Sequence, residues 1–589
     1  MVKKAAAIVI AILIVSALAY VVFRLNHSNE NLIPAFEEGG FNLIIEDEYI
    51  TSPKSLKIEN GEILLDFDTL KKYFDPSLKW DETSQKVIVS TKDRTIKMKT
   101  GGLTSFVNDG LLSLNIPIVQ DEDVIYIPIE FLSDFYGIEI THVEQNNVVI
   151  IDYKKDFLHT ANIIEPGAVL RSGRDSKYPI LRRFDDFDGT GNSFKYQMRI
   201  FEEYDKWYKI RTWDGIVGFI EKQYVVAKIE GGTISGKEQK ESLDEEKEKK
   251  SSSEAYEGKI NLVWDMVYTR RSNPWSVPDM KGLDIISPTW FQLQNSKGDL
   301  MNRAYSGYVK WAHEKGYKVW ALLSNDFQDA EMTSKFLKDD KAIENFTRQI
   351  LAYASLYNLD GINIDFENFY QRDRDLFTRF IEIITPKLKE QGLVVSVDVN
   401  DIPCYDKKAL SMTADYIMYM SYDQHWRTSP VAGSVAQVSW QERILKRVLE
   451  EEGVPREKLL LGLPYYTRLW EEKTENGAMS LSSVALTMEE AKNTIIENDA
   501  EVVWDEESGQ FYAEYEKENS RFRIWLEDEN SINLKSSLVH KYNLAGVCAW
   551  SMYFVSDNIW DVLYRNLKEI DGYEQWLKLN ENNEYIFVY

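Results

Sequence analysis

The C-terminal half of the chain alternates short apolar runs with amphipathic stretches of helical spacing. This alternation is typical of a parallel α/β domain, in which each strand is followed by a helix that covers it. In the stretch 304–315, for example, Tyr308, Trp311 and Ala312 recur at the spacing of one helix face. Eight runs have the length and composition of buried strands: 260–268, 283–291, 317–325, 359–367, 393–400, 415–423, 459–466 and 544–552.

Eight β/α repeats within residues 259–575 predict an α/β fold, a (β/α)8 TIM barrel. The connection between the last two strands is too long for one helix. It contains the hairpin-like text "GQFYAEYEKENSRFRIWLED", so we expect an insertion at about 470–528.

The first half of the chain carries shorter, β-patterned runs. Residues 42–154 contain two similar halves, each with a strand, a short helix-like stretch ("DTLKKYF", "EFLSDFYG") and a closing strand. This α+β segment resembles the N-terminal domain of copper amine oxidases. Its only histidine is His142, so we expect no copper site there.

A second small β-rich domain is expected over residues 160–228, which end in "KWYKIRTWDGIVGFIEKQYV". The segment is similar to bacterial SH3-like cell-wall modules, and a spacer without a ligand is the alternative. Residues 231–258 have many charges and almost no large apolar residues, which predicts a solvated linker.

At the N-terminus, Lys3 and Lys4 precede an uncharged run, residues 5–23, that is long enough to span a bilayer. We therefore expect residues 1–25 to anchor the protein in the cell membrane by a single pass, with the rest outside the cytoplasm. A cleaved signal peptide is the alternative, because Ala17 and Ala19 offer a small-x-small site, and the protein would then be secreted or held in the cell wall.

Composition narrows the classes of partner. A formal net charge of -26 argues against nucleic acid, which needs basic patches. Two cysteines and six scattered histidines suggest no metal site, and nothing in the sequence requires a cofactor. The aromatic content is high, with 16 Trp and 33 Tyr, which provides rings that can stack on sugars.

The stretch "LDGINIDFEN", residues 359–368, places three polar side chains at every second position of an apolar strand. Alternate residues of a strand face opposite sides, so Asn363, Asp365 and Glu367 form one column pointing into the barrel. Glu367 comes last, at the carboxyl rim where barrel active sites lie. Buried salt bridges are the structural alternative, but residues 360–367 contain no Lys or Arg. Buried acids without cations have raised pKa values, which favours a chemical role.

The string from Asp360 to Glu367 resembles the DGxxxDxE signature of family 18 glycoside hydrolases, the chitinase and endo-β-N-acetylglucosaminidase family. Three further segments match in order: "MYMSYD" (418–423), "LGLPYYTRLW" (461–470) and "GVCAW" (546–550). The resemblance covers about residues 257–570.

The resemblance implies a role for each matching residue. Glu367 is expected to be the general acid, and Asp365 to accept a hydrogen bond from the acetamido N–H of the substrate. Tyr422 is expected to hold the acetamido oxygen, which attacks the anomeric carbon in this family. The expected substrate-binding residues are Asn363, Asp360, Met420, Asp423, Trp550, Trp290 and Tyr465, with Trp550 as the floor beneath the sugar; Trp290 and Trp470 stack on sugars or belong to the core.

Asn363 departs from the family pattern, because many chitinases have Asp there. An amide cannot change charge, so Asp365 should depend more on Glu367 for its titration. The Asn variant resembles the spore-cortex and cell-wall branch of the family, which favours peptidoglycan over chitin as the N-acetylglucosamine-containing substrate. The alternatives are a non-catalytic, lectin-like surface protein and a protein whose N-terminal domains mainly serve adhesion or cell-wall binding.

Overall fold

The structure is a computed structural model that describes residues 16, 28–37, 39–83, 85–92, 94–155, 157–185, 187, 196–231, 256–267, 274–475 and 478–580. The chain divides into two compact units. The first contains residues 1–58, 63–70 and 121–250, and the second contains residues 59–62, 71–120 and 251–589. Each unit has its own hydrophobic core.

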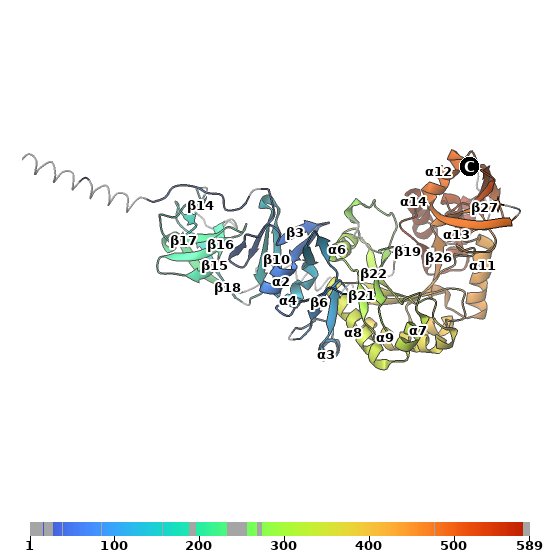
Figure 1. The fold of residues 1–589 in the computed structure, drawn as a ribbon, viewed down its shortest axis with the longest axis horizontal. Coiled ribbons are helices and arrows are strands. Elements are labelled where there is room, and N and C mark those ends of the chain that lie inside the picture. Colours follow the sequence, from blue (N-terminus) through green and yellow to red (C-terminus); the bar gives the residue numbers. More distant parts are fainter. Residues whose placement is uncertain are drawn as a thin grey trace, which may run out of the picture. The chain divides into compact units, whose positions relative to one another are not determined.

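The second unit contains a closed barrel of eight parallel strands. Its strands β19, β22 and β26 are labelled in Figure 1. The strand β19 pairs with both β20 and β32, which closes the ring. This confirms the predicted TIM barrel, and each predicted strand contains or overlaps an observed one. The strands are β19 (Ile260–Asp265), β20 (Ile285–Leu293), β22 (Lys318–Ser324), β23 (Gly361–Asp365), β24 (Val394–Val399), β25 (Tyr416–Tyr419), β26 (Leu459–Pro464) and β32 (Gly546–Trp550).

Several barrel helices begin at an aspartate whose side chain accepts a hydrogen bond from the first-turn backbone N–H groups. Asp329, Asp339, Asp406 and Asp528 do so for α7, α8, α10 and α13. The helices of the barrel and its C-terminal end are α6 (Ser306–Glu314), α7 (Ala330–Leu337), α8 (Asp340–Tyr357), α9 (Arg374–Glu390), α10 (Lys407–Thr413), α11 (Val438–Lys446), α13 (Glu529–Lys541), α14 (Asn558–Tyr564) and α15 (Tyr573–Leu579); β21 (Leu300–Asn302) extends the sheet beside β20.

The strand β23 presents opposite faces to helices and barrel, as its alternation predicts. On the outer side, the ring of Phe366 lies against Phe377 and Phe380 of α9, with centroids 5.7 and 5.4 Å away. On the inner side, Asn363 bonds to Trp264 of β19. The apolar face therefore anchors the strand, and the polar face is left to the lumen.

An antiparallel sheet is inserted between β26 and α13. Its order is β28-β27-β31-β30-β29. Lys535 of α13 forms a fully buried ion pair with Glu527, which also accepts a hydrogen bond of 2.8 Å from Gln510 of the insertion. The inserted elements are β27 (Tyr466–Glu475), β28 (Ala478–Thr487), α12 (Met488–Glu497), β29 (Glu501–Asp505), β30 (Gln510–Lys517) and β31 (Ser520–Trp525).

The segment 42–153 has a short helix at each of the two predicted positions. Part of this segment belongs to the first unit and part to the second. In the second unit, β7 and α3 lie against the barrel. Asn115 donates from its backbone N to Tyr353 Oη of α8 at 2.8 Å and from Nδ2 to the Leu300 carbonyl at 2.6 Å. Arg348 of α8 donates to the Val107 carbonyl at 2.9 Å. The elements are β1 (Asn42–Ile45), β2 (Glu48–Ile50), β3 (Leu56–Glu59), β4 (Glu62–Asp66), α2 (Phe67–Tyr73), β5 (Lys79–Asp81), β6 (Lys86–Ser90), α3 (Gly101–Asn108), β7 (Ser113–Ile116), β8 (Val119–Asp121), β9 (Val124–Pro128), α4 (Ser133–Tyr136), β10 (Ile138–Val143) and β11 (Val148–Tyr153).

The second β-rich domain is one seven-stranded sheet of order β14-β13-β17-β16-β15-β12-β18. The expected likeness to SH3-like modules is not supported, and most of the predicted linker 231–258 lies outside the described residues. The strands are β12 (Phe157–Ile163), β13 (Val169–Arg171), β14 (Ile180–Arg183), β15 (Gln197–Glu203), β16 (Trp207–Thr212), β17 (Val217–Glu221) and β18 (Val225–Gly231).

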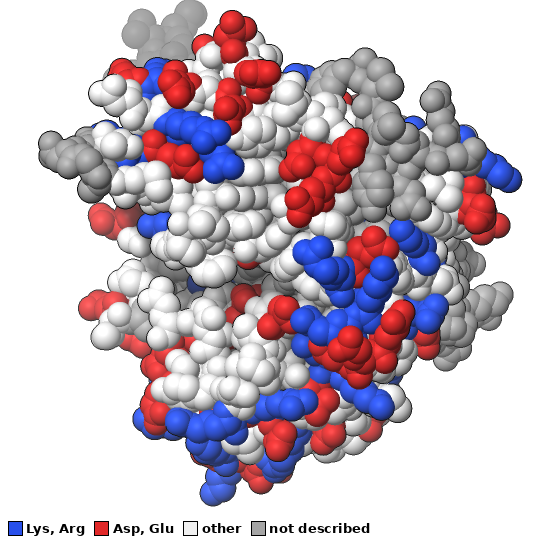
Figure 2. All heavy atoms as spheres, turned by 90° about the vertical axis from the view of Figure 1, so that its right-hand side faces the viewer, with Lys and Arg blue, Asp and Glu red and all other residues white. Residues whose placement is uncertain are grey.

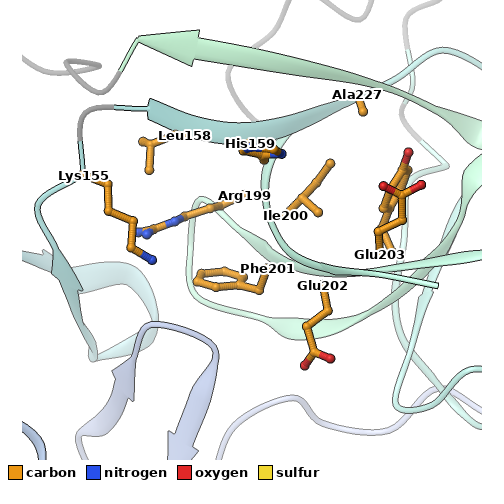
Figure 3. A pocket seen from close by; sticks show the side chains of 10 residues that line it. Lys155, Leu158, His159, Arg199, Ile200, Phe201, Glu202, Glu203 and Ala227 are labelled. Carbon is orange, nitrogen blue, oxygen red and sulfur yellow. The ribbon is translucent and has the colours of Figure 1, made fainter.

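This sheet contains a pocket of about 390 Å³ beside β12 and β15. Figure 3 shows Lys155, Arg199 and the ring of Phe201 on one side of it. Both cations already have partners, since Arg199 pairs with Asp152 at 2.7 Å and Lys155 with Glu46 at 2.6 Å. The pocket therefore offers no unpaired positive charge from these two residues to an anion.

The expected membrane anchor requires a correction. Apart from Ser16, residues 1–27 lie outside the described residues. Within the ranges that the structure describes, no helix has the length and apolar character needed to cross a bilayer. The predicted single-pass membrane localisation is thus not supported.

We expect Phe366→Ala to destabilise the barrel by about 3–5 kcal/mol, because Phe366 is fully buried among aromatic rings and its truncation leaves a cavity. Chemical unfolding of the full chain, followed by tryptophan fluorescence, measures the change. Phe327→Ala is the control, since that ring is 38% exposed. Equal losses for the two variants would contradict the assigned face of β23.

Candidate active site

The acidic column of β23 ends at the carboxyl rim of the barrel. Asn363 and Asp365 are buried inside the strand, and Glu367 lies two residues beyond its end, partly accessible. Asn325, which follows β22, fixes the backbone of Glu367 in both directions. The Glu367 backbone N donates to Asn325 Oδ1 at 2.8 Å, and Asn325 Nδ2 donates to the Glu367 carbonyl at 2.8 Å. These two hydrogen bonds therefore hold the backbone of Glu367 in place, although the residue lies beyond the end of the strand.

Asn363 lies at the centre of a polar network inside the barrel. Its Oδ1 accepts from Trp264 Nε1 at 2.8 Å and from Ser287 Oγ at 3.2 Å. Its Nδ2 donates to Asp398 Oδ1 at 2.6 Å and to Ser396 Oγ at 3.1 Å. An indole N–H can only donate, so the amide oxygen must face Trp264 and the amide NH₂ must face Asp398.

Asp398 of β24 is a third buried acid that the sequence analysis missed. The register pairs Asn363 with Ser396 and Ile364 with Val397, so Asp398 lies opposite Asp365. A signal was present, because Ser396, Asp398 and Asn400 alternate along 393–400 as the residues of β23 do.

The three carboxyls are held without a cation. Within the described part of the chain, no lysine or arginine contributes to the electrostatics of Asp365, Glu367 or Asp398. Burial raises the pKa of Glu367 to about 7, with a further contribution from Asp423, while a 3.3 Å hydrogen bond from Asn400 opposes the rise. The site thus keeps a protonated carboxyl near neutral pH.

The two aspartates are also raised. Burial, with the charges of Glu367 and Asp398, holds the pKa of Asp365 well above its usual range. Burial does the same to the pKa of Asp398, although the hydrogen bond from Asn363 opposes it. The pKa of Asp365 therefore depends on Glu367, as expected from Asn363, and also on Asp398. Its buried Oδ1 has no hydrogen-bond partner in the described chain.

Four other predicted site residues converge on the same end of the barrel. Met420, Tyr422 and Trp550 pack on the apolar cluster inside the barrel, and Trp550 lies 6.1 Å from Trp264 between ring centroids. Asp423, with φ of 59°, accepts a hydrogen bond from Tyr466 Oη at 2.6 Å and influences the pKa of Glu367.

The remaining predicted residues are not brought to this site. Asp360 lies at the opposite end of β23, where it pairs with His313 at 2.7 Å and Lys318 at 3.2 Å. Trp290 is buried against Tyr308 of α6, Tyr465 is buried against Trp560 of α14, and Trp470 is buried with its Nε1 donating to the Gly433 carbonyl. Of the alternatives for Trp290 and Trp470, the structure favours the core.

Accessible rings come instead from loops that follow barrel strands. Phe327, Trp426 and Tyr553, after β22, β25 and β32, are 38%, 51% and 67% exposed. Figure 2 shows a face of the C-terminal part with a hollow bordered mainly by uncharged residues. Among the residues described, no group of three or more His, Cys, Asp or Glu is placed to hold a metal ion.

A barrel with cation-free carboxyls at its carboxyl rim fits the class of glycoside hydrolases, and the comparisons identify that class. Residues 268–554 belong to the glycosyl hydrolases family 18, and residues 44–151 are a copper amine oxidase N-terminal domain. Both assignments confirm the resemblances drawn from the sequence.

Among curated proteins, the chain is 27% identical over 290 residues to the uncharacterized glycosylase YvbX of Bacillus subtilis (strain 168), which covers 46% of this chain and 81% of that protein. It is 23% identical over 257 residues to the cortical fragment-lytic enzyme of Bacillus anthracis, covering 41% of this chain and 58% of that one. The solved C-terminal domain of a putative chitinase from Desulfitobacterium hafniense DCB-2 aligns with a TM-score of 0.47 and 27% identity, over 53% of this chain and 99% of that chain.

We expect Glu367→Gln to change how the stability of the protein depends on pH. The folded pKa of Glu367 is raised to about 7, so its protonated form favours the folded state below its unfolded pKa, and this contribution is lost as pH rises through 7. Relative to wild type, the variant should gain up to about 3 kcal/mol between pH 5 and 8. Urea unfolding at both pH values measures the gain, and an identical pH dependence in both proteins would contradict the raised pKa.

Proposed function

We propose that the barrel hydrolyses β-1,4 bonds next to N-acetylglucosamine in cell-wall peptidoglycan or a chitin-like glycan. The observation that carries this proposal is Glu367, a carboxyl at the barrel rim with a pKa of about 7 and a fixed backbone. Such a group is protonated in a large fraction of molecules at neutral pH and is able to act as a general acid.

The proposed mechanism is substrate-assisted. Glu367 protonates the glycosidic oxygen while the 2-acetamido oxygen of the substrate attacks the anomeric carbon, so the glycosidic bond breaks and an oxazolinium ion forms. Asp365 accepts the acetamido N–H through its Oδ1, which has no hydrogen-bond partner among the described residues, and stabilises the positive charge. Tyr422 orients the acetamido oxygen, and Trp550 supports the sugar ring.

In the second half of the reaction, Glu367 acts as a general base. Having lost its proton to the leaving group, it takes a proton from a water molecule that attacks the anomeric carbon. The configuration of the sugar is retained because two displacements occur. A pKa near 7 suits both steps, since the group must give and regain a proton at the same pH.

The substrate class is supported by the relatives and by the rim. A cortical fragment-lytic enzyme and a di-N-acetylchitobiase are among the similar proteins, at 23% and 22% identity. The exposed rings of Phe327, Trp426 and Tyr553 offer apolar faces on which sugars stack. The abundance of aromatic residues suits a carbohydrate ligand, and a net charge of -26 argues against nucleic acid.

The test measures release of reducing ends from purified peptidoglycan and from chitin oligomers by the full chain. Glu367→Gln should reduce the rate by at least about 100-fold, because an amide cannot donate the proton. Mass spectrometry of the new reducing end identifies the sugar at the cut.

Glu344→Gln is the matched control, since Glu344 is exposed on α8 and should leave the rate unchanged. If wild type and Glu367→Gln release sugar at the same rate, the proposal fails. Tight binding of the oligomers without hydrolysis by wild type would establish the lectin-like alternative instead.

A further inference from the structure

Asp398 has no role in the reaction proposed above, yet it is built into the site. It is 1% exposed, it lies opposite Asp365 on the neighbouring parallel strand, and it faces the same lumen. Neighbouring strands are about 4.8 Å apart, so two carboxyls at facing positions are close enough to interact strongly. Apolar side chains border the same part of the lumen: Met418 Sδ lies 3.5 Å from Asn363 Nδ2, and burial together with the Asp398 charge raises the pKa of the Cys548 thiol.

Asn363 makes the two aspartates unequal. Its oxygen is occupied by Trp264 and Ser287, so its NH₂ is committed to Asp398, at 2.6 Å. Asp398 therefore has a donor that stabilises its negative form, whereas Asp365 Oδ1 has no partner among the described residues. In the absence of substrate, the arrangement favours a negative Asp398 and a protonated Asp365.

We propose that Asp398 is a positioning residue that shares one proton with Asp365. The inference rests on the proposed function for its purpose. When the substrate amide approaches, the proton leaves the Asp365 carboxyl and joins the Asp398 carboxylate, so Asp365 becomes the anion that accepts the acetamido N–H. The proton returns when the product leaves, and the pair keeps a single negative charge throughout.

This assignment explains why Asn363 is compatible with activity. The carboxyl that the family pattern has at position 363 is absent here, but Asp398 supplies one from the next strand, bonded to the amide that replaced it. The titratable groups that influence this pair, or are influenced by it, are Glu367 after β23, Tyr405 before α10, Tyr422 after β25 and Cys548 of β32, with Asp423 acting on Glu367.

Proton counting tests the proposal without any substrate. The pH dependence of unfolding between pH 7 and 8 gives the protons taken up on folding. We expect Asp398→Asn and Asp365→Asn each to lower the uptake by about one proton, and the double variant to lower it by no more than either single variant. This non-additivity is the signature of one shared proton. Additive losses, or an unchanged uptake in Asp398→Asn, would overturn the proposal.

An exchanged pair provides a second, independent variant. Asn363→Asp combined with Asp398→Asn keeps one aspartate and one asparagine but moves the carboxyl to β23, so we expect the wild-type proton uptake. On chitin oligomers, Asp398→Asn should lower kcat by about tenfold or more with little change in KM, and the exchange should restore most of kcat. Failure of the exchange to recover both uptake and kcat would count against sharing.

The two proposals fail separately. If wild type hydrolyses no glycan, the proposed function falls, while the proton count still decides the role of Asp398. If wild type is active but the losses of protons are additive, the function stands and the sharing is refuted.

Discussion

The constraint on which the site depends is the burial of three acids on which no lysine or arginine of the described residues acts. Desolvation opposes the charged form of each carboxyl, and each charge opposes the others, so the barrel can hold them only by keeping protons at neutral pH. The raised pKa values of Asp365, Glu367 and Asp398 follow from this single cause. A cationic neighbour would have stabilised the fold more simply, and it would also have removed the proton that an acid catalyst needs.

Contacts from the surrounding barrel hold these acids in place without adding charge. The amide of Asn363 satisfies donors and acceptors on three other strands of the barrel, β19, β20 and β24, without carrying charge. On the outer face, Phe366 anchors the strand in an aromatic cluster, and Asn325 clamps the backbone of Glu367. These neutral contacts hold the carboxyls in place without lowering their charge repulsion. The pKa values of the acids therefore stay raised, which acid catalysis requires.

Local alternation was enough to predict the barrel and the inner column of β23, because the faces of a strand are set by a period of two residues. It did not reveal that Asp398 lies opposite Asp365, since that depends on the register between strands distant in sequence. Trp290 and Trp470 were assigned to the rim as one of two alternatives, yet they are buried. Whether a ring faces helices, core or solvent is decided by tertiary packing, so the exposed Trp426 and Tyr553 also escaped notice.

The helix α8 touches two parts of the chain that family boundaries separate. One side of α8 covers the barrel, and the other side contacts the segment 71–120. On that side, Tyr353 accepts a hydrogen bond from β7, and Arg348 donates one to the end of α3. A shortened protein beginning at residue 257 would keep every catalytic group but expose this buried seam to water. A shorter version of the enzyme that is to keep these contacts therefore has to include the segment 71–120.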